Sequence, residues 1–366
     1  MGISETYARG RELVVSRPFV LVVALVVGLL FVDIVRQLAT PGGLNAGQLA
    51  SFLWDGLVTG LAIGLAGVGL SMTYSILNFA NFGHGDYVTS GAFAGWAVTW
   101  LIAGAGQFDV ATLLFIGSLS TSQLGVSMFG TPLAVVAGLV VAAVAAVALS
   151  LVIDRLVYRP MREEGGITLL IASIGVALAL RYTLVLFFTT DVRGLTAGGA
   201  TFDLSMGADA LTVTAHEITL VVVAVALMLG VHLLLQRSKL GKAMRAMVDN
   251  EDLARVTGIP TERVVRFTWI IGGGLAGAAG FLLALERGGL AFNLGWRLLL
   301  PVFAAVILGG IGSIYGAMFG GLAIGIARSV SAVWIPTEFS LVASFVVMIL
   351  VLLFKPSGIF GGKTTA

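Results

Sequence analysis

Long apolar stretches recur along this chain, and they constrain its fold more than any other feature. A membrane-spanning helix needs about 20 mostly apolar residues. Only 11% of the residues are charged, against about 25% in soluble domains, which excludes an ordinary soluble protein. The sequence predicts an all-α, polytopic membrane protein in which residues 1–366 form a single transmembrane domain with about 8–10 spans. The stretches lie at 19–35, 52–77, 88–104, 132–153, 167–188, 218–235, 267–285, 298–333 and 339–354.

Three regions need an interpretation of their own. The stretch 298–333 is too long for one crossing and is interrupted by Gly309–Ser313, so it is expected to form two spans or a broken helix. The first stretch is expected to be an uncleaved span and not a signal peptide, because no small-residue cleavage site follows it. Region 106–131 is too rich in Gly, Ser and Thr to assign.

Basic residues predict the orientation of the spans, because cytoplasmic loops carry an excess of Lys and Arg. The basic segments are the N-terminus, residues 154–162, residues 237–266, and the C-terminal Lys355 and Lys363. All of these segments fall on the same side of the membrane if residues 106–131 do not cross it. We therefore expect a multi-pass protein of the cell membrane with both termini in the cytoplasm.

Composition excludes several functions. A net charge of +2 gives no basic footprint for nucleic acid, and the lack of cysteine excludes thiolate metal sites and a cysteine nucleophile. The three histidines are too scattered to suggest a metal cluster. The tail 357–364 resembles a phosphate-binding loop, but Ser357 stands where the first glycine is needed. We expect no catalytic residues, metal or cofactor in this chain.

One loop concentrates charge. Residues 237–266 hold seven basic and four acidic residues. Within them, the spacing of Met244, Met247 and Leu253 predicts an amphipathic helix over 240–256, ended by a turn at Gly258. Such a helix either lies on the membrane surface or forms a docking site for a cytoplasmic partner, and the residues alone leave both alternatives open.

Residues 78–86 are the densest polar cluster in an apolar context. Polar groups at membrane depth must be satisfied by protein or by a water-filled cavity, and Gly83 and Gly85 allow a helix to break. This favours a discontinuous segment lining a pathway. The alternative is a plain turn at the membrane surface, where the charges are solvated.

Single charges also occur near the ends of the predicted spans. Arg181 is expected to reach the membrane interface or to form a structural ion pair, and not to bind substrate. The same interpretation applies to Asp33, Asp55, Glu286, Arg287, Arg297 and Arg328. Glycines four residues apart indicate close helix packing, and the string GLAIG occurs at both 60–64 and 321–325.

Four ordered motifs together resemble a known family. They are NFGHGD at 81–86, LGKAMRA at 240–246 with ARVTGI at 254–259, AVILGGIGSIYGA at 305–317, and KPSGIFG at 355–361. In this order they resemble the permease subunits of branched-chain amino acid ABC importers, over roughly residues 50 to 361. The chain departs from that family's usual pattern at Gly83, where alanine is usual, and in the additional first span.

The resemblance implies a membrane subunit without enzymatic activity. Its implied partners are a second related permease, two cytoplasmic ATPases that bind the ATP, and an external solute-binding protein. It implies that the 240–258 segment contacts an ATPase and that the 78–86 segment belongs to the translocation pathway. The coupling residues are then Glu251, Asp252, Ala254 and Gly258, and the pathway residues are Asn78, Phe79, Asn81, Phe82, His84 and Asp86.

The substrate implied by the resemblance is a branched-chain amino acid. Importers of urea and short amides have similar permeases, so those substrates remain alternatives. Two other classes remain as well: an ion-coupled secondary transporter with His84 and Asp86 as a titrating pair, and a passive channel for a small neutral solute.

Overall fold

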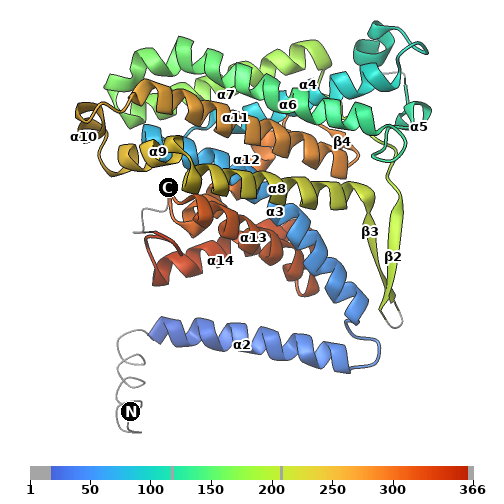
Figure 1. Cartoon of the computed structure of the whole chain (residues 1–366). Helices are drawn as coiled ribbons and strands as arrows, with labels where there is room; N and C mark the ends of the chain where they lie inside the picture. The colour runs from blue at the N-terminus through green and yellow to red at the C-terminus, as the bar shows by residue number, and fades with distance from the viewer. Residues whose placement is uncertain (1–17, 117–118, 207–208, 362–366) are drawn as a thin grey trace, which may run out of the picture.

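The computed structural model describes residues 18–116, 119–206 and 209–361, which are predominantly helical (Figure 1). The long helices are α2 (Pro18–Ala39), α3 (Ala46–Leu77), α4 (Gly83–Ala103), α6 (Pro132–Ile153), α7 (Gly166–Phe188), α8 (Ala215–Arg237), α11 (Thr261–Glu286), α12 (Leu294–Gly309), α13 (Ile314–Val330) and α14 (Ser340–Phe354). The shorter elements are η1 (Thr112–Ile116), α5 (Thr121–Leu124), η2 (Asp154–Tyr158), η3 (Arg159–Glu164), α9 (Lys239–Asp249), α10 (Glu251–Val256), η4 (Ser331–Val333) and η5 (Thr337–Phe339). Four short strands complete the described part: β1 (Arg193–Gly194), β2 (Thr201–Met206), β3 (Asp209–Thr214) and β4 (Gly289–Leu290).

This architecture confirms the predicted all-α membrane fold. In the described ranges, seven helices are long and apolar enough to cross a membrane, and α12 is apolar but shorter. The predicted interruption of 298–333 is confirmed, since α12 and α13 are separated by a turn over residues 310–313. That turn needs glycine at Gly310 and Gly312, whose φ angles are +106° and +85°.

The core lies around α3 and α11, and the other spans surround them. In the most apolar part of each helix, 89% of the residues of α3 and 83% of those of α11 are buried, compared with 11% for α14. The outer helices leave large apolar side chains uncovered, such as Leu133 on α6, Leu186 on α7 and Val222 on α8. An apolar face without cover suits contact with lipid.

The two copies of the GLAIG string pack against each other where α3 crosses α13. A Cβ atom added at Gly60 would lie 2.9 Å from the Cα of Leu322, and one added at Gly56 would lie 2.8 Å from the Cα of Ile326. Backbones that approach this closely leave no space for side chains, which is the role of small residues between membrane helices. The repeated string therefore marks a packing interface.

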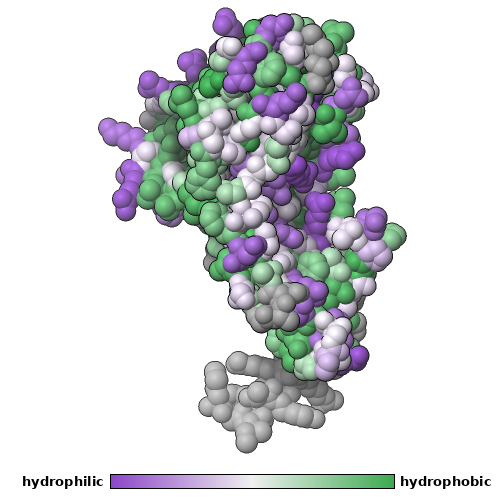
Figure 2. Space-filling model, turned by 90° about the vertical axis from the view of Figure 1, so that its right-hand side faces the viewer, coloured by the Kyte–Doolittle hydropathy of each residue, from purple (hydrophilic) through white to green (hydrophobic). Residues whose placement is uncertain are grey.

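The bundle has two distinct ends (Figure 1). The α10 end carries α9 and α10, and the described residues after α14 lie there too. The hairpin end carries α5 and the β2–β3 hairpin, in which Thr201 pairs with Thr214. Figure 2 looks at the hairpin end and shows hydrophilic residues spread across it among apolar ones.

Most of the predicted basic segments share one end. Arg159 of segment 154–162 and Arg255 of segment 237–266 line the same cavity at the α10 end. Region 106–131 contains only short helical segments where the structure describes it, so it adds no crossing there. The N-terminal residues 1–17 and Lys363 lie outside the described residues.

Candidate functional site

The predicted 78–86 segment forms the turn between α3 and α4 and the first turn of α4. Asn78 ends α3 in the left-handed conformation, with φ +53°, and its N–H donates to the Tyr74 carbonyl. Asparagine tolerates this conformation better than most residues. The Phe82 N–H donates to Ser173 Oγ on α7 at 3.0 Å, which holds the turn against the bundle.

The structure decides against one of the two interpretations of this segment. The plain surface turn was wrong, because Asn81, His84 and Asp86 are all buried. The helix is interrupted between α3 and α4, and the pathway role of the segment stays a prediction. Burial of a polar segment requires partners for its side chains, and His84, Asp86 and the Oδ1 atom of Asn81 have them, whereas Nδ2 of Asn81 is buried without a hydrogen-bond partner among the described residues.

His84 and Asp86 are held by different elements. One ring nitrogen of His84, Nε2, lies 2.9 Å from the Ala66 carbonyl of α3. Asp86 accepts two hydrogen bonds from Arg181 of α7, from Nε at 3.2 Å and from a terminal nitrogen at 2.9 Å. The two side chains are therefore committed to structural contacts, which does not favour the titrating pair of an ion-coupled transporter.

Arg181 forms the structural pair that was one of its two expected roles, and the expected reach to the interface was wrong. Its side chain is only 10% exposed and its partner Asp86 is 0% exposed. The guanidinium also lies over the ring of Trp296, 4.4 Å from the ring centre, a cation–π contact. Two opposite charges in apolar surroundings were the sequence signal for this pair.

The remaining predicted pathway residues differ in accessibility. Asn78 is exposed, whereas Phe79 is buried and packs on Tyr158, with ring centres 5.2 Å apart. Phe82 is half-buried and packs on Phe303 of α12 at 5.0 Å. In the isolated chain, only Asn78 and part of Phe82 are open to a solute, and the other four residues are enclosed by protein.

A cavity at the α10 end brings the predicted pathway segment and the predicted coupling segment together. This α10 cavity has a volume of about 710 Å³. Asn78 lines it from the end of α3, and Glu251 and Arg255 line it from α10. The other charged residues of the lining are Arg159, Arg162, Glu163 and Glu262.

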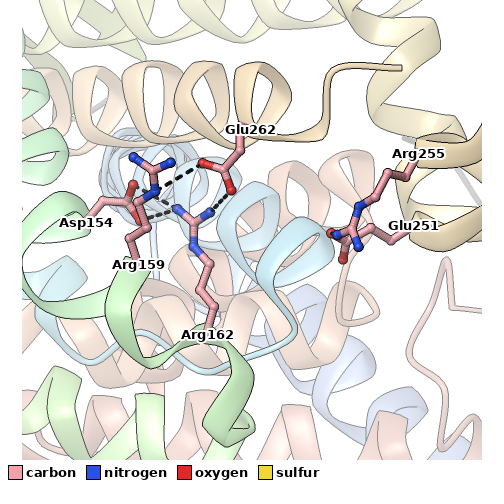
Figure 3. Close-up of polar contacts among 6 residues, drawn as sticks. All are labelled: Asp154, Arg159, Arg162, Glu251, Arg255 and Glu262. Atoms are coloured by element: carbon pink, nitrogen blue, oxygen red, sulfur yellow. Dashed lines mark hydrogen bonds and ion pairs between the residues drawn. The ribbon is translucent and has the colours of Figure 1, made fainter. Parts of the chain in front are cut away.

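An ion-pair network crosses this cavity from η3 to α11 (Figure 3). Arg162 donates to Asp154 at 2.7 and 2.9 Å and to Glu262 at 2.7 Å. Arg159 adds a longer contact of 3.5 Å to Glu262. Because Asp154 follows α6 directly and Glu262 lies in the first turn of α11, the network joins two separate connections at this end.

Tyr158 extends this connection to the polar segment. Its hydroxyl donates to Asn81 Oδ1 at 3.1 Å, and its ring stacks on Trp269 of α11 at 5.3 Å. Tyr158 ends η2, a π-helical turn, and such turns are frequent at functional sites. The sequence interpretation missed Tyr158, Asp154 and Glu262, because no spacing along the chain relates them.

The predicted amphipathic helix over 240–256 is confirmed in part. It is two helices, α9 and α10, because Asn250 leaves the helical conformation and its side chain accepts from the Leu253 N–H at 2.9 Å. The apolar face of α9 is covered by the chain itself, since Met244 and Met247 are buried. This excludes membrane lipid as the cover for that face.

The outer surface of α10 remains uncovered. Leu253 is 61% exposed and Val256 is 84% exposed. The exposed Glu251 pairs with Arg255 at 2.9 Å beside them. Two of the four predicted coupling residues are not part of this exposed surface. Ala254 is buried, and Gly258 forms the turn after α10 with φ +86°.

The amino-acid sequence of this chain can be compared with models of known protein families. A family model described as "Branched-chain amino acid transport system / permease component" matches residues 52–352. The chain belongs to this family. The matched region runs from α3 to α14 and therefore includes nearly all of the described helices of the permease. Helix α2 precedes the matched region.

Curated relatives agree with this assignment. The permease is 33% identical over 312 residues to the high-affinity branched-chain amino acid transport system permease protein LivH of Escherichia coli, covering 84% of this chain and 94% of that protein. It is 30% identical to BraD of Pseudomonas aeruginosa, a protein of the same description, with the same coverage. The galactofuranose transporter permease YtfT of Escherichia coli is 27% identical over 61% of each chain. No solved structure matches the chain.

Proposed function

We propose that this permease imports branched-chain amino acids as one subunit of an ATP-driven complex. The substrate is taken from the similarity to LivH and BraD, whose names describe branched-chain amino acid transport. The partners are a second related permease, two cytoplasmic ATPases that bind the ATP, and an external solute-binding protein. The family assignment supports a subunit of a larger transport system.

The observation that carries this proposal is the uncovered surface of α10. Leu253 and Val256 stand exposed at the end of the bundle, with the Glu251–Arg255 ion pair beside them. An apolar pair rimmed by charges is typical of the centre of a protein interface. We assign this surface to the ATPase contact, with Glu251 and Asp252 at its rim and with Ala254 and Gly258 fixing the shape of α10.

This assignment also sets the orientation. If α10 contacts a cytoplasmic ATPase, the α10 end faces the cytoplasm and the hairpin end faces outward. Both termini then lie in the cytoplasm of a cell-membrane protein, and the hairpin end receives the binding protein. The excess of basic residues at the α10 end supports this direction.

The ion-pair network supplies a route from ATPase movement to the pathway segment. Movement of α10 displaces the start of α11, where Glu262 holds Arg162. Arg162 holds Asp154, which lies one turn before Tyr158, and Tyr158 holds Asn81. Interfaces of this kind convert small shifts into helix displacements, so the pathway beside Asn78, Phe79, Asn81 and Phe82 opens and closes with the nucleotide cycle.

A pair of leucine substitutions tests the ATPase contact. Leu253→Glu introduces a charge at the proposed interface, and we expect loss of most ATPase that co-purifies with the permease, together with loss of ATP-driven uptake. Leu204→Glu is the matched control for ATPase co-purification, because Leu204 is similarly exposed but lies in β2 at the opposite end. Unchanged co-purification and uptake in the Leu253→Glu complex would contradict the proposal.

The same preparation tests the class of transporter. Uptake of labelled leucine into proteoliposomes that contain the whole complex should require ATP and persist when an uncoupler removes ion gradients. Uptake that disappears with the uncoupler and persists without any ATPase would indicate an ion-coupled secondary transporter. Flux through this chain alone would indicate a passive channel.

A further inference from the structure

A second charged cavity lies at the hairpin end, on the opposite side of the bundle from α10. Its volume is about 320 Å³, at the small end of the range for ligand pockets. Four helices or their ends build it: α3, α8, α11 and α13. The lining residues are Asp55, Val58, Thr59, Glu217, Glu286, Arg287, Arg328 and Ser329.

The negative charges of this cavity gather together. Asp55 and Glu286 are each within electrostatic range of Glu217 and repel it. Glu217 is fixed in place, because its Oε2 accepts from the Thr214 N–H at 2.7 Å and from Trp54 Nε1 at 3.1 Å. Asp55, Glu217 and Glu286 therefore give the cavity lining a negative part, which favours a positively charged group of a ligand.

The positive charges of the lining are Arg287 and Arg328. Arg287 is within electrostatic range of Arg328 and Arg297. The Arg287–Glu286 contact is long, at 3.8 Å. Among the described residues, no ion pair within 4.0 Å joins Arg328 to a carboxylate, and none joins Asp55 to a cation. Apart from the long Arg287–Glu286 contact, Asp55 and Arg328 therefore face the cavity without an ion-pair partner among the described residues.

A metal ion does not explain this arrangement. No group of three acidic or histidine side chains in the described ranges is placed to hold one, and two guanidiniums beside the carboxylates oppose a bare cation. A ligand that carries an ammonium and a carboxylate on the same small framework satisfies both halves of the lining. Asp55, Glu286, Arg287 and Arg328 were expected as separate charges at span ends, but they line one cavity from α3, α11 and α13, and Glu217 of α8 lines it with them.

We propose that this cavity binds the zwitterionic head of a free α-amino acid. The ammonium group lies among Asp55, Glu217 and Glu286, and the carboxylate lies between Arg287 and Arg328, where guanidinium groups are suited to bidentate contacts. The side chain of the ligand lies toward Val58. This inference rests on the proposed function, and it adds a substrate-recognition site in the permease itself, at the end that receives the solute.

The test measures binding by the assembled complex in nanodiscs, without the external binding protein, by saturation-transfer NMR. The probes are L-leucine, leucinamide, which lacks the carboxylate, and 4-methylpentanoate, which lacks the ammonium. We expect L-leucine to bind about tenfold or more tightly than either analogue, the effect of losing one charged hydrogen-bonding partner. Equal binding of the three probes, or no binding of L-leucine, would overturn the proposal.

Two variants separate recognition from a structural role. Arg328→Gln should weaken the binding of L-leucine about tenfold and leave the binding of leucinamide unchanged, so that the two probes bind with equal affinity. Asp55→Asn should weaken the binding of L-leucine by a similar factor and leave the binding of 4-methylpentanoate unchanged. Arg297→Gln is the control, because Arg297 is exposed at the same end but does not line the cavity. Variants that weaken all probes equally would show a structural role and refute the site.

Uptake by the complete system distinguishes this failure from failure of the proposed function. If the wild-type complex with its binding protein drives ATP-dependent uptake of leucine but both variants bind the probes as Arg297→Gln does, the assignment of this cavity as the recognition site is wrong and the proposed function stands. If the wild-type complex shows no ATP-dependent uptake, the proposed function itself is wrong.

Discussion

The Arg181–Asp86 pair gives the sharpest test of how this bundle is held together. Asp86 is fully buried on α4, and Arg181 of α7 donates two hydrogen bonds to it at 3.2 and 2.9 Å. Each charge-assisted hydrogen bond contributes about 1.5–3 kcal/mol, and removing one partner of a buried pair costs about 3–5 kcal/mol because the other charge remains buried. We therefore expect Arg181→Gln to lower the free energy of unfolding by about 3–5 kcal/mol.

Arg181→Gln and Asp86→Asn should lower the free energy of unfolding by different amounts. Arg181→Gln leaves a carboxyl group with no exposed surface and no cation beside it, whereas Asp86→Asn leaves a guanidinium that is 10% exposed and still lies over Trp296. Asp86→Asn should therefore be the milder change. The double variant should be less destabilised than the sum of the singles by about 1–3 kcal/mol, as expected for directly coupled residues.

The assay is unfolding of the purified permease from detergent micelles by SDS, followed by tryptophan fluorescence. Tyr182→Phe is the control, because Tyr182 is the next residue on α7 and its side chain is exposed. A cost below about 1 kcal/mol for Arg181→Gln, the size expected of an exposed interfacial charge, would refute the buried pair. So would strict additivity of the two single variants.

The other predictions concern packing and coupling. Gly321→Ala should lower the free energy of unfolding by about 1–3 kcal/mol, because its Cβ would meet the backbone of Gly64. Gly230→Ala on α8 has open space around its Cβ and should raise the free energy of unfolding by up to about 1 kcal/mol. SDS unfolding of both variants checks this, and equal effects would contradict the close α3–α13 interface. Arg162→Gln should lower the amount of substrate imported per ATP hydrolysed while the complex still assembles, as measured in proteoliposomes against Glu163→Gln, whose side chain is outside the ion-pair network. An unchanged ratio would show that the network does not transmit movement.

Much of the fold could be predicted from the sequence because hydropathy acts locally. The length and apolarity of each span can be read from its own residues, so the sequence predicted the interruption of 298–333 that separates α12 from α13. The division of the amphipathic segment at Asn250 was not, because a helix cap there depends on one backbone conformation that the apolar spacing does not reveal.

The candidate site was predictable only in part. Residues 78–86 and 251–258 stand out as local clusters, and the structure places Asn78 and Glu251 on the same cavity. The residues that join these clusters, Tyr158 and Arg162, lie about 80 to 100 positions away from their partners Asn81 and Glu262. Such contacts arise from helix packing, and one sequence without tertiary information gives no signal for them.

The glycine crossing of α3 and α13 has a mechanical consequence. Where backbone lies on backbone, no side chain is present to change rotamer, so the contact has no second packing arrangement available to it. We therefore expect α3 and α13 to keep one arrangement relative to each other. Because α3 leads from the charged cavity at one end to Asn78 at the other, we expect this pair of helices to hold the two sites at a fixed distance from each other.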